Sequence, residues 1–195
     1  MISCGILELS SAPSLGNAKT DSMEKVIQVL NRMQADGIIE RFAIGGGIAA
    51  IRYLEPYLTD DIDVFISPVV VGANGLVSFG RIYSYLQDLG YNTEREYIRI
   101  EGWLVQFVPA SESVQEEAVT LANRVAFAGE YTPIFSAEHL AAELLRSGRL
   151  KDHTRVLALL ESEQMDMEVF HDIIRRHGLA EKWKEFAVRY DWEQE

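Results

Sequence analysis

The sequence predicts an α+β fold, in which a small mixed β-sheet with its helices forms the core and a helical bundle follows. Strand-like alternation and helical stripes are interspersed over the first two thirds of the chain, whereas the last third is helical throughout. Strands and helices do not alternate regularly, which disfavours a doubly wound parallel sheet. We expect an N-terminal arm at residues 1–19, a core at 20–135 and a helical region at 136–195.

The first predicted helix begins at Asp21. Asp21 and Glu24 form a D-x-x-E capping box, and apolar residues at helical spacing follow it. These residues are Met23, Val26, Ile27, Leu30 and Met33. Gly37 is expected to end the helix, because glycine readily adopts the left-handed conformation found after a last helical turn.

The core is expected to combine short strands with short helices. The predicted strands are Arg41–Ile44, Asp61–Ser67, Tyr97–Glu101, Trp103–Val108, Arg124–Phe127 and Tyr131–Phe135. The predicted helices are Ile48–Leu54, Leu76–Leu89 and Ser111–Ala122, with a loop at Pro68–Gly75. The strand at Asp61 is the clearest, because Ile62, Val64 and Ile66 alternate with their neighbours in the period of two that a strand requires.

The last third is predicted to contain four helices. They are Ser136–Arg146, Lys151–Glu161, Asp166–Arg176 and Ala180–Tyr190. Trp183, Phe186, Tyr190 and Trp192 fall at helical spacing, which is more typical of a packed core or a subunit contact than of a base-stacking platform. The histidines, His139, His153, His171 and His177, form no recognisable ligand pair and are expected to be structural or exposed.

Composition argues against several kinds of partner and site. The 195 residues carry 18 Lys and Arg against 30 Asp and Glu, a net charge of −12, so duplex nucleic acid is disfavoured as a partner. Cys4 is the only cysteine, which excludes an intramolecular disulfide and a cysteine zinc site. No basic leader and no apolar run of about 20 residues is present, so we expect a cytoplasmic protein without a membrane span.

Two chemical devices lie close together in the chain. Gly45, Gly46 and Gly47 form a turn between a strand and a helix start, where the backbone can approach a phosphate closely. Asp61 and Asp63 lie two apart on a strand and therefore on one face, where both carboxylates can bind one divalent ion. Hard oxygen ligands beside a phosphate favour Mg²⁺ or Mn²⁺.

These residues resemble the DNA-polymerase-β-like nucleotidyltransferase superfamily, and within it the bacterial AbiEii-type group. The resemblance extends from about Ile38 to Leu160. The segments that carry it are Ile44–Gly46, Thr59–Phe65, Val105–Pro109, Ala137–Leu140 and Gly148–Asp152. It implies a small mixed sheet that binds a nucleoside triphosphate and a metal.

The resemblance also implies a role for each site residue. Gly45 and Gly46 would hold the triphosphate, Asp61 and Asp63 would bind Mg²⁺ or Mn²⁺, and Lys151 would neutralise phosphate charge. The reaction would move a nucleoside monophosphate from an NTP to a hydroxyl of a small molecule, an RNA or a protein, by two-metal in-line displacement.

Three positions depart from the family pattern. Active members carry a third carboxylate on a neighbouring strand, but Gln106 is the only polar residue of Trp103–Val108. Glu143 stands where the toxin-type proteins have a lysine, and Arg155 where they have an aspartate. These departures keep a second hypothesis open, in which a catalytically degenerate fold binds a nucleotide or a protein partner of the toxin–antitoxin type. A metal-dependent glycosyltransferase is disfavoured, because the glycine turn precedes the D-x-D pair.

Overall fold

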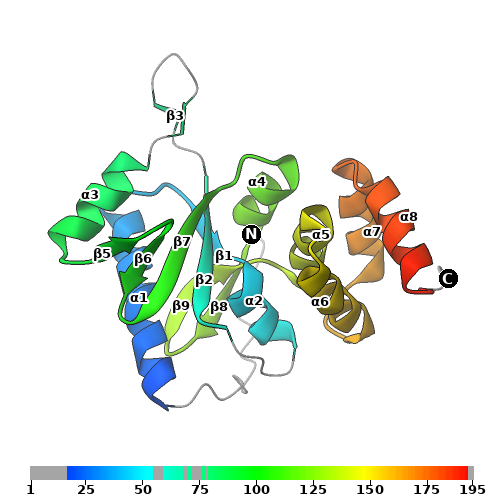
Figure 1. Cartoon of the computed structure of the whole chain (residues 1–195), viewed down its shortest axis with the longest axis horizontal. Coiled ribbons are helices and arrows are strands. Elements are labelled where there is room, and N and C mark those ends of the chain that lie inside the picture. Colours follow the sequence, from blue (N-terminus) through cyan, green and yellow to red (C-terminus); the bar gives the residue numbers. More distant parts are fainter. Residues whose placement is uncertain (1–16, 55–58, 68–69, 72–75, 78, 193–195) are drawn as a thin grey trace, which may run out of the picture.

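The structure, a computed structural model, describes residues 17–54, 59–67, 70–71, 76–77 and 79–192. It consists of a seven-stranded mixed sheet with helices packed on it, and of four further helices gathered at one side of that sheet (Figure 1). The predicted α+β class is therefore confirmed.

The helices and strands follow one another along the chain as expected, with a few exceptions. The helices are α1 Asn17–Ala35, α2 Gly46–Tyr53, α3 Gly80–Asp88, α4 Ser113–Thr120, α5 Ala137–Ser147, α6 Leu150–Glu161, α7 Met167–Arg176 and α8 Ala180–Arg189. The strands of the main sheet are β1 Phe42–Ile44, β2 Asp61–Ile66, β5 Asn92–Glu94, β6 Tyr97–Ile100, β7 Trp103–Pro109, β8 Asn123–Phe127 and β9 Glu130–Ile134. A separate hairpin joins β3 Val70–Val71 to β4 Leu76–Val77.

The strand order of the main sheet is β5-β6-β7-β2-β1-β9-β8. β2 runs parallel to β7, and β1 runs parallel to β9, whereas the other neighbours are antiparallel. β2 therefore has a strand on each side, and all its side chains project from the two faces of the sheet. The neighbours of Asp61 and Asp63 within the sheet are therefore residues of β7 and β1.

The apolar stripe of α1 packs against the sheet as the sequence predicts. Its five stripe residues are completely buried, and α1 contacts β7 and β9. Ile62 and Val64 of β2 are also completely buried, so the apolar side of β2 belongs to the core. The opposite side of β2 carries the two aspartates, at half-exposed positions.

Several predicted boundaries are wrong. α1 begins at Asn17, not Asp21, so the D-x-x-E pair lies inside the helix, where Asp21 is exposed and Glu24 is half-buried. The helix expected from Leu76 begins at Gly80, because Leu76–Val77 forms β4. A short apolar run fits a strand as well as a helix. Residues 1–16 of the expected arm and Cys4 lie outside the described residues.

Two strands were not expected at all. β5 carries three exposed polar residues, Asn92, Thr93 and Glu94, and pairs with β6 by its backbone. It shows no apolar alternation, because an edge strand does not have to bury a side-chain face. β3 lies within the segment expected to be a loop.

The C-terminal helices pack around α5. Ser136 caps α5 by accepting a hydrogen bond from the backbone N–H of His139, and Gly148 ends the helix with a φ of +66°. Trp183 and Phe186 of α8 are buried, which confirms the expectation that these aromatic residues belong to a core. Within the described part of the chain, no helix is long and apolar enough to cross a membrane.

Candidate functional site

Asp61 and Asp63 project from one face of β2, as the alternation predicts. Both are half-exposed, and the intervening Ile62 is completely buried on the other face. Thr59, just before the strand, donates a hydrogen bond from Oγ1 to Asp61 Oδ1 at 2.5 Å. The two carboxylates therefore share one side of the sheet, and one of them is held by a neighbouring hydroxyl.

The glycine turn lies directly beside this carboxylate pair. The backbone N–H of Gly45 donates to the carbonyl oxygen of Asp63 at 2.9 Å, which extends the pairing of β1 with β2 by one residue. Gly46 has a φ of +54°, and a Cβ atom there would lie 1.9 Å from Asp63 Oδ2. Only glycine permits this close approach of the start of α2 to the carboxylate.

Gly45 has a different steric reason to be glycine. A Cβ atom there would lie 2.5 Å from the ring of Phe65 and 3.3 Å from that of Phe135. These rings pack 4.7 Å apart between centroids. Gly45 therefore makes room for core packing, whereas Gly46 makes room for the Asp63 carboxylate.

The strand register places neutral and aromatic side chains next to Asp63. Gln106 of β7 is the direct partner of Asp63, and Leu104 is the partner of Asp61. Extending the β6–β7 register by one step places Tyr97 opposite Gln106. Burial is the main cause that raises the pKa of the Tyr97 phenol, followed by the charges of Glu96, Asp61 and Asp63, and the effect of the two aspartates is consistent with this proximity. The position beside Asp63 on the neighbouring strand is therefore an amide and not an acid.

Asp63 has an unusual electrostatic environment. Burial and, secondly, the negative charge of Asp61 raise its pKa to about 6, against the opposing effect of nearby cations. Within the described residues, no donor is hydrogen-bonded to the Asp63 carboxylate. A charged carboxylate in such surroundings is destabilised, and a bound cation would relieve that cost.

The cations come from the start of α6. Arg149, Arg155 and Lys151 each lower the pKa of Asp63, in decreasing order of effect, so all three lie within electrostatic range of it. Lys151 was expected here from the sequence, and it is exposed in the first turn of α6. Arg149 was missed, because an exposed arginine at a helix start carries no distinctive sequence signal.

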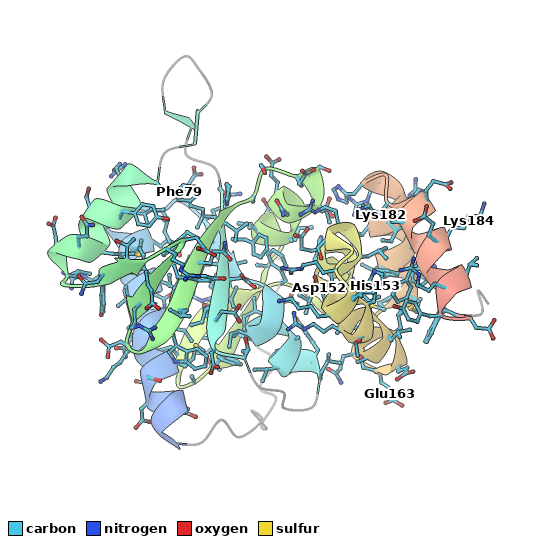
Figure 2. The ribbon with its side chains drawn as sticks, in the orientation of Figure 1. Phe79, Asp152, His153, Glu163, Lys182 and Lys184 are labelled. Carbon is cyan, nitrogen blue, oxygen red and sulfur yellow. The ribbon has the colours of Figure 1, made fainter. Side chains whose placement is uncertain are left out.

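Asp152 organises this cationic segment. Its side chain is completely buried and accepts hydrogen bonds from Ser147 Oγ at 2.5 Å, Arg149 Nε at 2.6 Å and Arg155 Nη1 at 3.3 Å. Figure 2 shows Asp152 on α6 beside His153, whose Nδ1 lies 3.0 Å from the hydroxyl of Tyr190 on α8. The Lys-Asp pair thus divides into an exposed cation and a buried structural carboxylate.

Glu143 has a structural role. It accepts hydrogen bonds from Gln115 of α4 at 2.9 Å and from Arg146 of its own helix at 2.7 and 3.0 Å. Its side chain is buried, so this acid joins α4 to α5. Packing therefore accounts for an acid at this position.

A second polar cluster lies away from the aspartates, around Glu117 of α4. Arg176 makes two hydrogen bonds to this carboxylate, while Nε2 of His139 and Nε2 of His177 lie 3.2 and 2.9 Å from its two oxygens. Arg176 is the main cause that lowers the pKa of Glu117 to about 2. Both histidine side chains are buried, as expected of structural residues, although the sequence did not show that they converge.

The residues present fit one Mg²⁺ ion better than two. Among the residues that the structure describes, no group of three His, Cys, Asp or Glu side chains is arranged to hold a metal. Mg²⁺ is commonly bound by one or two carboxylates together with substrate phosphates. Asp61 and Asp63 meet that requirement, and Gln106, at the paired position of β7, would offer its amide oxygen as a further neutral ligand.

No protein-family profile and no curated protein matches this sequence. Its fold is similar to solved structures at low identity. The antibiotic-resistance factor ANT(2'')-Ia in solution is 14% identical, with a TM-score of 0.48 over 88% of this chain and 97% of that one. The crystal structure of ANT(2'')-Ia with adenylyl-2''-tobramycin is 16% identical, with a TM-score of 0.43 over 88% and 98%.

A third similar structure is an antigenic nucleotidyltransferase-like protein from Paracoccidioides brasiliensis. It is 16% identical, with a TM-score of 0.49 over 84% of this chain and 93% of that one. None of the three is described as an AbiEii-type protein, so that assignment stays a prediction. Because the identities and the TM-scores are low, the functional interpretation rests on the residues of the site itself.

Proposed function

We propose that this protein is a Mg²⁺-dependent nucleotidyltransferase that moves a nucleoside monophosphate from an NTP to an acceptor hydroxyl. The observation that carries the proposal is the contact of Gly46 with the Asp63 carboxylate, with Asp61 on the same face of β2. This contact brings a helix start suited to phosphate next to a carboxylate pair suited to a divalent cation.

Asp61 and Asp63 are the residues that would hold the metal. A bound Mg²⁺ (or Mn²⁺) supplies charge neutralisation on the phosphates and on the pyrophosphate leaving group. Burial and the neighbouring Asp61 already disfavour the charged form of Asp63, so the pair is prepared for a cation. In this class of reaction the protein contributes mainly positioning and charge.

The glycines and Lys151 would hold the nucleotide. The first N–H groups of α2 lack partners within the helix, as at any helix start, and Gly46 leaves no side chain between them and the Asp63 carboxylate. Lys151, exposed on α6 and within electrostatic range of Asp63, would neutralise phosphate charge. Gln106 cannot accept a proton near neutral pH, so it would orient ligands and would not act as a base.

The acceptor is a small molecule, an RNA end or a protein hydroxyl, within the cytoplasm. The net charge of −12 disfavours a long duplex. The AbiEii-type resemblance adds a protein partner of the toxin–antitoxin type as a further proposal. The acceptor, the compartment and the protein partner are additions to the proposed reaction, and none of them is evidence for it.

Gln106 favours a second candidate function. It is the direct strand partner of Asp63, at the position where an active member would supply its third carboxylate. A fold with two acids and one amide can still bind a metal and a nucleotide after it has lost turnover. In that case the protein is a nucleotide-binding or interaction protein.

Two measurements separate these candidates. Thermal melts with Mg²⁺ and each NTP detect binding, because a ligand that binds only the native state raises the melting temperature. Transfer of label from each NTP to cell lysate detects turnover. We expect both signals in the wild type and neither in Asp63→Asn, while Asp88→Asn, the same change at the exposed end of α3, keeps both.

Each result assigns one candidate. Binding that depends on Asp63 without label transfer favours the nucleotide-binding protein. A wild type that shows neither signal contradicts both candidates, as does an Asp63→Asn variant that matches Asp88→Asn in both measurements.

A further inference from the structure

The start of α6 presents two arginines that are fixed by one carboxylate. Asp152 is completely buried, and Arg149 and Arg155 each donate a hydrogen bond to one of its two oxygens. Ser147 supplies a further donor from the end of α5. A buried carboxylate that accepts hydrogen bonds from three side chains has a defined position, so it holds both arginine side chains in defined positions as well.

The start of α6 carries more positive charge than Asp152 alone neutralises. Arg149, Lys151 and Arg155 carry three positive charges, and the negative charges of Asp63 and Glu143 also lie within electrostatic range of Arg149. This segment is connected to the carboxylate pair by packing: α6 packs on α5, and α5 packs on α2, whose first residue, Gly46, lies against the Asp63 carboxylate. One arginine would be enough to neutralise Asp152, so a structural ion pair alone does not account for the second arginine or for the lysine.

Arg149 is positioned to bind a further anion. Its side chain is 59% exposed, and within the described contacts it reaches Asp152 through Nε alone, at 2.6 Å. In the described part of the chain, neither of its two terminal nitrogens donates a hydrogen bond. The planar guanidinium matches two phosphate oxygens at once, and a side chain that is already fixed loses less entropy on binding.

We propose that Arg149 and Arg155, fixed by Asp152, form a clamp for the polyphosphate of the nucleotide that binds at the Asp61–Asp63 pair. The inference rests on the proposed function and goes beyond it by assigning phosphate binding to two arginines. It also explains how the site tolerates Gln106: the arginines supply cationic charge where fewer acidic ligands are available for metal. Asp152 is a positioning residue in this arrangement, because it acts through the arginines.

The test uses inorganic tripolyphosphate in EDTA, so that metal plays no part. Its binding to the full chain is measured by titration calorimetry at pH 7.5 and low salt. We expect the wild type to bind, and Arg149→Gln to bind at least tenfold more weakly. Arg149→Lys keeps the positive charge but loses the planar guanidinium with its two donors, so its affinity for tripolyphosphate should lie between those of the wild type and Arg149→Gln. Arg175→Gln, which removes an arginine that is 75% exposed on α7, is the matched control and should bind as the wild type does.

The clamp is contradicted if the wild type does not bind tripolyphosphate, or if Arg149→Gln and Arg155→Gln bind it as tightly as Arg175→Gln. Circular dichroism checks that each variant is folded, and Arg149→Lys, which keeps a cation beside the buried Asp152, keeps the test decisive if a glutamine variant misfolds. Failure of the proposed function looks different: tripolyphosphate binding then depends on Arg149, but no label is transferred from any NTP. If label is transferred and Arg149→Gln leaves tripolyphosphate binding unchanged, the function stands and the clamp is wrong.

Discussion

Gly46 lies against the Asp63 carboxylate so closely that a Cβ atom on Gly46 would stand 1.9 Å from Oδ2. Gly46 also has a positive φ of +54°, which L-residues other than glycine adopt at a cost. A glycine turn and an acidic strand that are separate in the sequence thus form one unit. This contact makes the site sensitive to the smallest possible side chain.

Gly46→Ala should therefore damage both stability and binding. The left-handed backbone costs about 1–2 kcal/mol for a non-glycine residue, and displacement of Asp63 adds to it. Gly37→Ala is the matched control, because Gly37 has a φ of +68° but no atom within 4 Å of an added Cβ. Urea unfolding should show a smaller loss for Gly37→Ala, and only Gly46→Ala should lose the rise in melting temperature given by Mg²⁺ with NTP. Equal responses of the two variants would contradict the assigned contact.

Asp63→Asn should stabilise the metal-free protein at neutral pH. The native pKa of Asp63 is about 6, above its ordinary value of 3.8, so the native state holds this proton more tightly than the unfolded state. Stability is consequently lost as pH rises from about 4 through 6, by about 1–3 kcal/mol at pH 7.5. Urea unfolding in EDTA should show the gain at pH 7.5 and little of it at pH 4.

The control for this pH effect is Asp88→Asn, which should give the same small change at both pH values. Addition of Mg²⁺ should reverse the order, since it stabilises the wild type and leaves Asp63→Asn unaffected. A loss of stability in Asp63→Asn at pH 7.5 in EDTA would show that the carboxylate is stabilised in the native state.

Gln106→Asp should restore an acid beside Asp63. Three carboxylates in EDTA repel one another, so the melting temperature should fall. With Mg²⁺ the same variant should bind the ion roughly tenfold more tightly than the wild type, equivalent to about 1.4 kcal/mol. Gln106→Asn adds no charge, so it should neither lower the melting temperature in EDTA by repulsion nor tighten Mg²⁺ binding. If Gln106→Asp leaves Mg²⁺ affinity unchanged, residue 106 does not face the metal site.

Glu117→Gln should destabilise the packing of α4 on α7. The Arg176 guanidinium, with His139 and His177, lowers the pKa of Glu117 to about 2. The charged carboxylate therefore contributes about 1–3 kcal/mol above pH 4.5, and this contribution is lost as pH falls through about 2. The destabilisation measured by urea at pH 7 should fall by about half at pH 3.

Glu116→Gln removes the same charge from an exposed position of the same helix and is the control for Glu117→Gln. It should cost less than about 0.5 kcal/mol at either pH. Equal losses in the two variants would mean that the Glu117 cluster has no special role.

The sequence by itself determined the α+β class, the strand at Asp61 and the glycines between the first strand and its helix, although the helix begins at Gly46 and not at Ile48 as predicted. Each depends on local physics: alternation over a few residues fixes the two faces of a strand, and glycines and capping residues fix helix ends. The N-cap at Ser136 and the end of α5 at Gly148 were predictable for the same reason. Where local patterns are ambiguous, as at Leu76–Val77, or absent, as at β5, the prediction was wrong.

Only the tertiary structure decided which side chains surround Asp63. Gln106 stands beside it because β2 pairs in parallel with β7 in one particular register, which no local pattern encodes. The same holds for Arg149, whose position depends on the burial of Asp152, and for the meeting of His139 and His177 at Glu117. Contacts between residues distant in the chain arise from the packing of whole elements, and that packing determines the electrostatics of the site.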